Sequence, residues 1–291
     1  MAKTRDSDME WRGRSSGILI AATVWSALLG PWITEVHAGA EGGRIRVEYV
    51  APKDARHQAI YDLLRERHAL ERLQRLFSPL RLPSELVLQT SECEGIANAW
   101  YERGKVTICY ELLNVIQQPI PKDVTWGGIT HGDAVVGQFL YISAHEIGHG
   151  LFDLLNVPVF GNEEDAADQL ATYFMLRLGK DQARRLIYGA AYYYRKHLQN
   201  PRVTLGLEAF SGAHSKPQQR FFNLLCMGYG ANPAEFAEVV DKGYLPKSRS
   251  VSCQREYRRI TAAFQQLILP HVDQSIAKEV LDEEWLDLQP H

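Results

Sequence analysis

The sequence lacks any run of lysine and arginine interleaved with aromatic residues, and its formal net charge is −3. Composition therefore gives nucleic-acid binding no support. The sequence also lacks internal repeats and low-complexity tracts. A hydrophobic fraction of 45% and a charged fraction of 23% are ordinary for a soluble globular protein, and 291 residues suit one large or two small domains.

The first 40 residues differ from the rest of the chain. A positively charged start precedes an uncharged run at 15–34, and small residues at 38–40 follow at the spacing that signal peptidase recognises. This pattern predicts a secretory signal peptide and a periplasmic or secreted mature protein. The competing interpretation is an uncut membrane anchor, since the run is close to the length that spans a bilayer. Gly30 and Pro31 interrupt the run and favour the signal peptide.

Cysteine is scarce: the chain has four, and no two of them form a C-x-x-C pair. Zinc binding by cysteines is therefore disfavoured, whereas an even number in an exported chain predicts disulfides. Three pairings are possible. We expect the local one, Cys93 with Cys109 and Cys226 with Cys253, because a hairpin signal at Arg103-Gly104 brings the arms of the first pair together.

Periodicity predicts an α+β fold for residues 41–291, taken as a single domain. Alternating residues at 44–50, at 84–90 and on the two arms of the hairpin predict a small mixed sheet that ends near residue 110. Helical patterns follow the sheet, after one early helix at 55–77. The expected later helices are 111–118, 133–155, 163–178, 181–195, 217–228, 233–242 and 254–269. Strands first and helices afterwards are typical of the α+β class.

The stretch 141–168 holds the pattern with the most specific chemistry. His145 and His149 are four residues apart, so on a helix they share one face, with Glu146 about 100° away. This is the H-E-x-x-H arrangement, in which two imidazoles bind zinc and the glutamate acts on water. The alternative is a helix with two surface histidines. Gly148 and Gly150 argue against it, because glycine inside a helix costs about 1 kcal/mol relative to alanine and suits a close approach.

A catalytic zinc site needs a third protein ligand, and the acidic segment that follows supplies candidates. The apolar residues of the expected helix at 163–178 place Glu164 and Asp168 along the edge of its buried stripe, while Glu163 lies about 100° away. We expect Glu164 to be the ligand and Asp168 to accept a hydrogen bond from a ligand histidine. Glu163 and Asp165 are expected only to favour the helix N-terminus through its dipole.

The stretch AHEIGHGLFDLLNVPVFGNEEDAADQLAT resembles the gluzincin metallopeptidases, the thermolysin-like group, in which E-x-x-x-D follows H-E-x-x-H on another helix. A closer resemblance is to an uncharacterised bacterial family of secreted metallopeptidases. The segments CEGIANAWYERGKVTICYE and HSKPQQRFFNLLCMGYG carry it, over about residues 44–270. It implies a zincin-like fold, one Zn²⁺ and a peptide or protein substrate. It also implies a donor to the oxyanion, for which His214 is the first candidate and Arg220 the second. Either residue has a plainer alternative: His214 could face water, and Arg220 could form a local salt bridge.

The sequence thus predicts a secreted or periplasmic zinc-dependent peptidase with Glu146 as general base. Two alternatives stay open: a zinc-binding pseudo-enzyme, and a metal-dependent hydrolase of another amide. A membrane partner is expected only if the N-terminal segment is uncut. Oligomeric state is not predicted.

Overall fold

A computed structural model of the chain describes residues 44–118, 120–122, 126–198 and 211–286. The expected signal peptide or anchor at 1–40 lies outside these residues. No helix among the described residues is long and apolar enough to cross a bilayer.

The sheet has four strands in the order β1-β2-β4-β3. The strands are β1 (Ile45–Tyr49), β2 (Leu86–Ser91), β3 (Ala99–Glu102) and β4 (Lys105–Cys109). β1, β2 and β4 are parallel, and β3 pairs antiparallel with β4 across the expected hairpin. β3 therefore forms one edge of the sheet. This small mixed sheet, followed by a largely helical remainder, confirms the α+β class.

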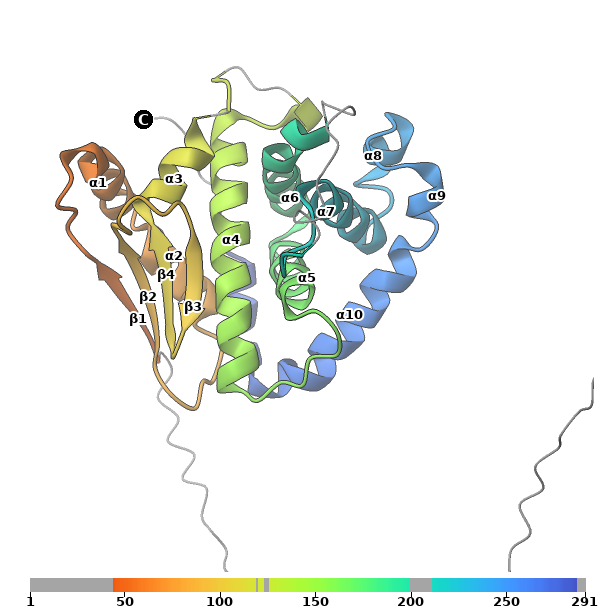
Figure 1. Cartoon of the computed structure of the whole chain (residues 1–291). Coiled ribbons are helices and arrows are strands. Elements are labelled where there is room, and N and C mark those ends of the chain that lie inside the picture. The colour runs from red at the N-terminus through yellow and green to blue at the C-terminus, as the bar shows by residue number, and fades with distance from the viewer. Residues whose placement is uncertain (1–43, 119, 123–125, 199–210, 287–291) are drawn as a thin grey trace, which may run out of the picture. The chain divides into compact units, whose positions relative to one another are not determined.

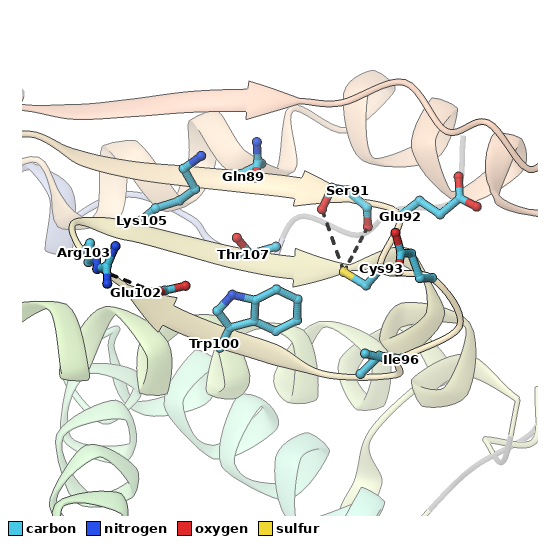
Figure 2. Close-up of a pocket in the computed structure, with 11 residues that line it drawn as sticks. Gln89, Ser91, Glu92, Cys93, Ile96, Trp100, Glu102, Arg103, Lys105 and Thr107 are labelled. Atoms are coloured by element: carbon cyan, nitrogen blue, oxygen red, sulfur yellow. Dashed lines mark hydrogen bonds and ion pairs between the residues drawn. The ribbon is translucent and has the colours of Figure 1, made fainter.

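Side-chain alternation gives the sheet two different faces. Leu86, Leu88, Val106 and Ile108 point to one face and are fully buried there under helices. The opposite face carries polar residues around Trp100, and Figure 2 shows them along a shallow hollow of about 620 Å³. The sheet is therefore half-covered, which antiparallel and mixed sheets can tolerate because one face can meet water.

The long helix α4 (His131–Leu154) stands between the sheet and the later helices (Figure 1). It packs on β3 and β4 on one side and on α5 (Glu163–Met175) and α6 (Lys180–Arg195) on the other. The remaining helices are α1 (Gln58–Glu66), α2 (Ala69–Phe77), α3 (Tyr110–Gln117), α7 (Pro217–Ala231), α8 (Ala237–Asp241), α9 (Lys247–Ser250), α10 (Cys253–Leu267) and α11 (Gln274–Leu281). Both faces of α4 are thus buried by contacts far apart in sequence.

The single helix expected at 55–77 is wrong, because the chain breaks at His68. His68 has a left-handed backbone with φ 50°, and α1 ends before it while α2 begins after it. The hydroxyl of Tyr49 on β1 accepts from the backbone N–H of Leu70 at 2.8 Å and donates to Glu71 at 2.6 Å. A side chain from the sheet thus satisfies a donor in the first turn of α2 and stabilises a new helix start.

Other helix boundaries also differ from the expectation. α4 begins at His131 rather than residue 133, because Thr130 is its N-cap and forms a capping box with Asp133. Only Ala237–Asp241 of the expected 233–242 helix is α-helical, and α9 and α11 were not expected. Short helices carry weak periodicity, which explains why the pattern does not reveal them.

The structure contains both disulfides expected from the sequence. Cys93 is joined to Cys109 with 5.6 Å between their Cα atoms, and Cys226 to Cys253 with 5.1 Å. The first joins the segment after β2 to the end of β4, and the second joins α7 to the start of α10. Each stabilises by about 2 to 4 kcal/mol if it acts by restricting the unfolded chain.

Candidate metal centre

The histidines of the H-E-x-x-H motif lie on the buried second half of α4. His145 is 2% exposed and Glu146 is 7% exposed. The Nε2 atoms of His145 and His149 are 3.2 Å apart. Carboxylate and ring atoms of Glu146, His145 and His149 all lie within 4.8 Å of one another. The helical spacing therefore brings two imidazoles and one carboxylate to a single point.

The glycines of the motif explain how other elements reach this point. A Cβ on Gly148 would lie 3.5 Å from Ala167 of α5, and one on Gly150 would lie 3.1 Å from the ring of Tyr101 on β3. The helix thus presents its two glycines to its two neighbours. The 3.1 Å distance at Gly150 is tight and reflects the close approach that the sequence suggested, whereas 3.5 Å at Gly148 is an ordinary contact that a Cβ would tolerate.

Glu164 is the carboxylate of α5 that meets the two histidines. Its Oε2 atom is 3.1 Å from His145 Nε2 and 3.4 Å from His149 Nε2. Four ligands at about 2.0 to 2.2 Å around a tetrahedral zinc ion are separated from one another by about 3.3 to 3.6 Å. The three atoms are 3.1 to 3.4 Å apart, within a few tenths of an ångström of the separation between three corners of such a site, which has a fourth corner for another group.

The connection between α4 and α5 accounts for the position of Glu164. Gly161 has φ 99°, a left-handed conformation that favours glycine. Asn162 then caps α5 by accepting from the backbone N–H of Glu164 at 2.9 Å. The hydrogen bond to His145 is the main reason why the pKa of Glu164 is lowered to about 2. Glu164 therefore presents an ionised carboxylate.

Asp168 lies one turn further along α5 and fixes the orientation of His145. Its Oδ1 atom is 2.8 Å from His145 Nδ1. Burial alone would raise the pKa of Asp168, but the hydrogen bond with His145 and the adjacent Arg220 guanidinium hold it below its usual value. An ionised Asp168 accepts the Nδ1 proton, so in neutral His145 the lone pair is on Nε2, where a metal could bind.

Arg220, the second candidate for the oxyanion donor, lies beside Asp168. It comes from α7, bonds Asp168 through Nη2, and lies over the rings of Tyr141 and Tyr194. Its plainer alternative, an ion pair, is what the structure contains. This ion pair is buried and reaches His145 through Asp168.

Glu163 departs from the expectation that it serves only the helix dipole. Its Oε1 atom accepts from His149 Nδ1 at 2.7 Å. His149 and His145 therefore each have a carboxylate partner on the nitrogen that faces away from Glu164. The reason is that His149 lies one turn beyond His145 and meets an earlier part of the antiparallel α5.

His214 reaches the same cluster from the segment before α7. Its Nε2 atom is 2.8 Å from Glu164 Oε2, and its ring stacks on His145 with centroids 5.8 Å apart. Its side chain is 56% exposed. Asn162 donates to the carbonyl of Ala213 at 2.5 Å and so holds this segment against the start of α5. The structure therefore brings His214 to the site while leaving it open to solvent.

Glu146 occupies the side of the cluster nearest β3. Burial raises the pKa of Glu146 above its usual value, and the neighbouring histidines and the backbone N–H of Tyr101 act in the opposite direction. Tyr101 also donates from its hydroxyl to Asp153 of α4 at 2.5 Å. β3 is thus held against α4, with Glu146 between them.

Comparison of the sequence with known protein families identifies the family of this chain. A family described as "putative metallopeptidase" matches residues 49–268, which is most of the chain. The chain belongs to this family. Comparison with curated proteins and with solved structures gives no match. A metallopeptidase family implies a metal cofactor, and the described residues of this member include groups that could hold one.

Two contacts of this candidate site are not suggested by the sequence. The helical register places Glu163 off the predicted ligand face, and the antiparallel packing of α5 on α4 brings it to His149. Arg220 lies 52 residues from Asp168, and no local pattern connects them. A lone arginine near the start of a helix gives no signal of such a partner.

Proposed function

We propose that this chain is a zinc-dependent peptidase of the gluzincin type, with His145, His149 and Glu164 as metal ligands. One observation carries the proposal: Nε2 of both histidines and Oε2 of Glu164 lie within 3.4 Å of one another. Two imidazoles and one carboxylate are a donor set found in catalytic zinc sites, where a fourth position stays open. The half-covered sheet, with its antiparallel edge strand beside the histidine helix, supports the zincin-like fold.

The metal would supply the first part of the chemistry. A zinc ion bound by these residues would lower the pKa of a coordinated water toward about 7 and polarise the scissile carbonyl. Asp168 and Glu163 hold the ligand histidines in the tautomers that leave Nε2 free. The protein thereby fixes the geometry before substrate arrives.

The proton transfers belong to Glu146. Its carboxylate accepts a proton from water as the water oxygen bonds to the carbonyl carbon of the peptide. It then delivers that proton to the amide nitrogen as the C–N bond breaks. His214 donates a hydrogen bond to the oxygen that becomes negatively charged. Its exposed position at the edge of the cluster, beside Glu164, supports this role.

The edge strand β3 provides a place for the substrate. β3 pairs with β4 on one side, and its Tyr101 lies beside Glu146 on the other. An extended peptide or protein segment would add to this edge as a further strand and so place a backbone carbonyl near the cluster. A nucleic-acid substrate has no support from the charge of the chain.

The proposed setting is the periplasm or the extracellular space. The apolar N-terminal run with its small-residue site would direct export, and residues 41–291 would be the mature domain. Two disulfides are usual in oxidising compartments and rare in the cytosol. These features support export independently of the metal site.

Replacement of Glu146 tests the proposed function. Glu146→Gln keeps the shape of the side chain but cannot accept a proton, so we expect it to retain one zinc per chain and to lose hydrolysis of a peptide library by about 10²- to 10⁴-fold. The exposed Glu66→Gln on α1 is the matched control and should keep full activity. Zinc content by elemental analysis and cleavage by mass spectrometry are the measurements. Wild-type activity in Glu146→Gln, or a chain that cannot be loaded with zinc, would contradict the proposal.

A further inference from the structure

An apolar groove of about 470 Å³ lies between α1, α2, α3 and the first half of α4. Leucine, isoleucine, valine and phenylalanine side chains form most of its wall, with the indole of Trp285 beside them. Leu63, on this wall, is 41% exposed. A concave site of this size, mostly apolar and with a few polar groups, is typical of small-molecule binding sites.

The charge at the groove has one sign. Its described lining includes Arg67, Arg72 and His131 but no aspartate or glutamate. Arg72 donates to the carbonyls of Glu284 and Trp285 and lies over the Trp285 ring, so it is held in place. Arg67 has no ion-pair partner among the described residues, and it is exposed. The groove therefore combines an apolar wall with a free cation at its α1–α2 corner.

We propose that this groove binds a long-chain monocarboxylate, a free fatty acid, with its alkyl chain along the apolar wall and its carboxylate at Arg67. An alkyl chain has no hydrogen-bonding groups, so it loses none in this groove. An extended peptide has one N–H and one C=O per residue, and burying these without partners costs free energy. The carboxylate matches the sign of the charge that lines the groove.

The proposal is independent of the proposed peptidase function. Val136 and Phe139 line the groove from the first half of α4, whereas His145 and His149 lie on its second half. Nine residues from Val136 to His145 correspond to about 13 Å along a helix. Ligand binding in the groove therefore needs neither a metal nor an intact Glu146.

Chain length gives the first test. Calorimetric titration of the full chain with saturated monocarboxylates of eight to about fourteen carbons should show affinity rising about fourfold per added methylene, the equivalent of about 0.8 kcal/mol, until the groove is full. Val136→Trp, which fills the groove, should weaken binding at least tenfold. The control Val251→Trp places the same ring on an exposed site between α9 and α10, outside the groove. It should leave affinity unchanged. Equal affinity for all chain lengths would overturn the proposal.

The head group gives the second test, with variants that do not touch the core. Wild type should bind a carboxylate about threefold to tenfold more tightly than the alcohol of the same chain length. Arg67→Gln should abolish that preference, while Arg65→Gln, two residues away in the last turn of α1 but outside the lining, should keep it. A preference that survives Arg67→Gln would overturn the assignment of the carboxylate.

Other occupants of the groove give distinct outcomes. Binding to anionic lipid vesicles without binding to free carboxylates would identify a membrane surface instead. Binding that begins only when the chain is shortened to end at Leu286 would identify the C-terminal residues as the occupant. Either outcome would overturn the proposal. Chain-length dependence together with the Arg67→Gln effect would support it.

Discussion

At the scale of single residues, Glu163 and Glu164 have different tasks although they are neighbours. Successive residues on a helix are about 100° apart, so the two carboxylates approach the histidines from different directions. Glu164 Oε2 lies near Nε2 of both histidines, and Glu163 Oε1 bonds the opposite nitrogen of His149. One is placed as a ligand and the other as a partner of a ligand.

Zinc titration should separate these tasks. Glu164→Ala should lose most zinc affinity because it removes a donor atom. Glu163→Ala should lose less than the roughly 10- to 100-fold usual for such partners, because its side chain is 55% exposed and water can replace it. Gln169→Ala, exposed on the same helix, is the control. Competition with a chromophoric chelator measures the affinities, and zinc release by Glu163→Ala alone would show that the ligand assignment is off by one residue.

Arg220 should act on the metal through Asp168. Arg220→Met keeps most of the bulk but leaves the Asp168 carboxylate buried beside His145 without its cation, so we expect zinc affinity to fall by about 10- to 100-fold. A double-mutant cycle with Asp168→Asn is the control: because the two residues act through one contact, the second substitution should add much less than it costs alone. Additive losses would show that Arg220 acts by another route.

At the scale of elements, the packing of α4 on α6 depends on glycine. A Cβ on Gly189 of α6 would lie 2.1 Å from the carbonyl oxygen of Asp133. That oxygen belongs to the backbone of α4 and cannot move aside without shifting the helix. This close approach fixes the position of the first half of α4 against α6. Because the helix is continuous, it also sets the direction of the second half, which carries the histidines.

Two alanine substitutions test this packing. Gly189→Ala should destabilise the protein by about 1 to 3 kcal/mol through overpacking. Gly148→Ala, whose Cβ would lie 3.5 Å from Ala167 in ordinary contact, should be neutral or gain up to about 1 kcal/mol of helix propensity. Urea unfolding measures both. Equal effects from the two substitutions would contradict the packing argument.

At the scale of the whole molecule, a buried carboxylate connects the sheet to the helices. Glu111 at the start of α3 accepts from the backbone N–H groups of Cys93 at 3.0 Å and Gly95 at 2.9 Å. Burial alone would raise the pKa of Glu111, but backbone N–H donors outweigh it and lower the pKa below its usual 4.5. A pKa that is lower in the folded state means that ionised Glu111 stabilises the folded protein.

The acid limb of stability should therefore depend on Glu111. Its contribution is present above about pH 4.5 and is lost as the pH falls toward its lower folded-state pKa, because the unfolded chain takes up the proton first. Glu111→Gln should lower the free energy of unfolding at pH 7 and make its fall between pH 5 and 3 shallower. The exposed Glu66→Gln should change neither. An unchanged acid limb in Glu111→Gln would show that other carboxylates govern acid unfolding.

The sequence by itself determined what depends on near neighbours along the chain. The helical repeat places His145 and His149 on one face. The turn residues of the hairpin bring Cys93 near Cys109, and strands that precede helices indicate the α+β class. These features need only local geometry. The register of one expected helix predicts Glu164 and Asp168, and the structure places Glu164 beside both histidines and Asp168 beside His145.

Only the tertiary structure decided what depends on residues far apart in sequence. Tyr49 accepts a hydrogen bond from Leu70 in the first turn of α2, Arg220 pairs with Asp168, and Glu163 bonds His149. Packing of separate elements creates these contacts. No repeat or spacing records them, since their partners meet only after the sheet, α4 and α5 are assembled. Local periodicity specifies which side chains share a face, and the packing of faces specifies which of them meet.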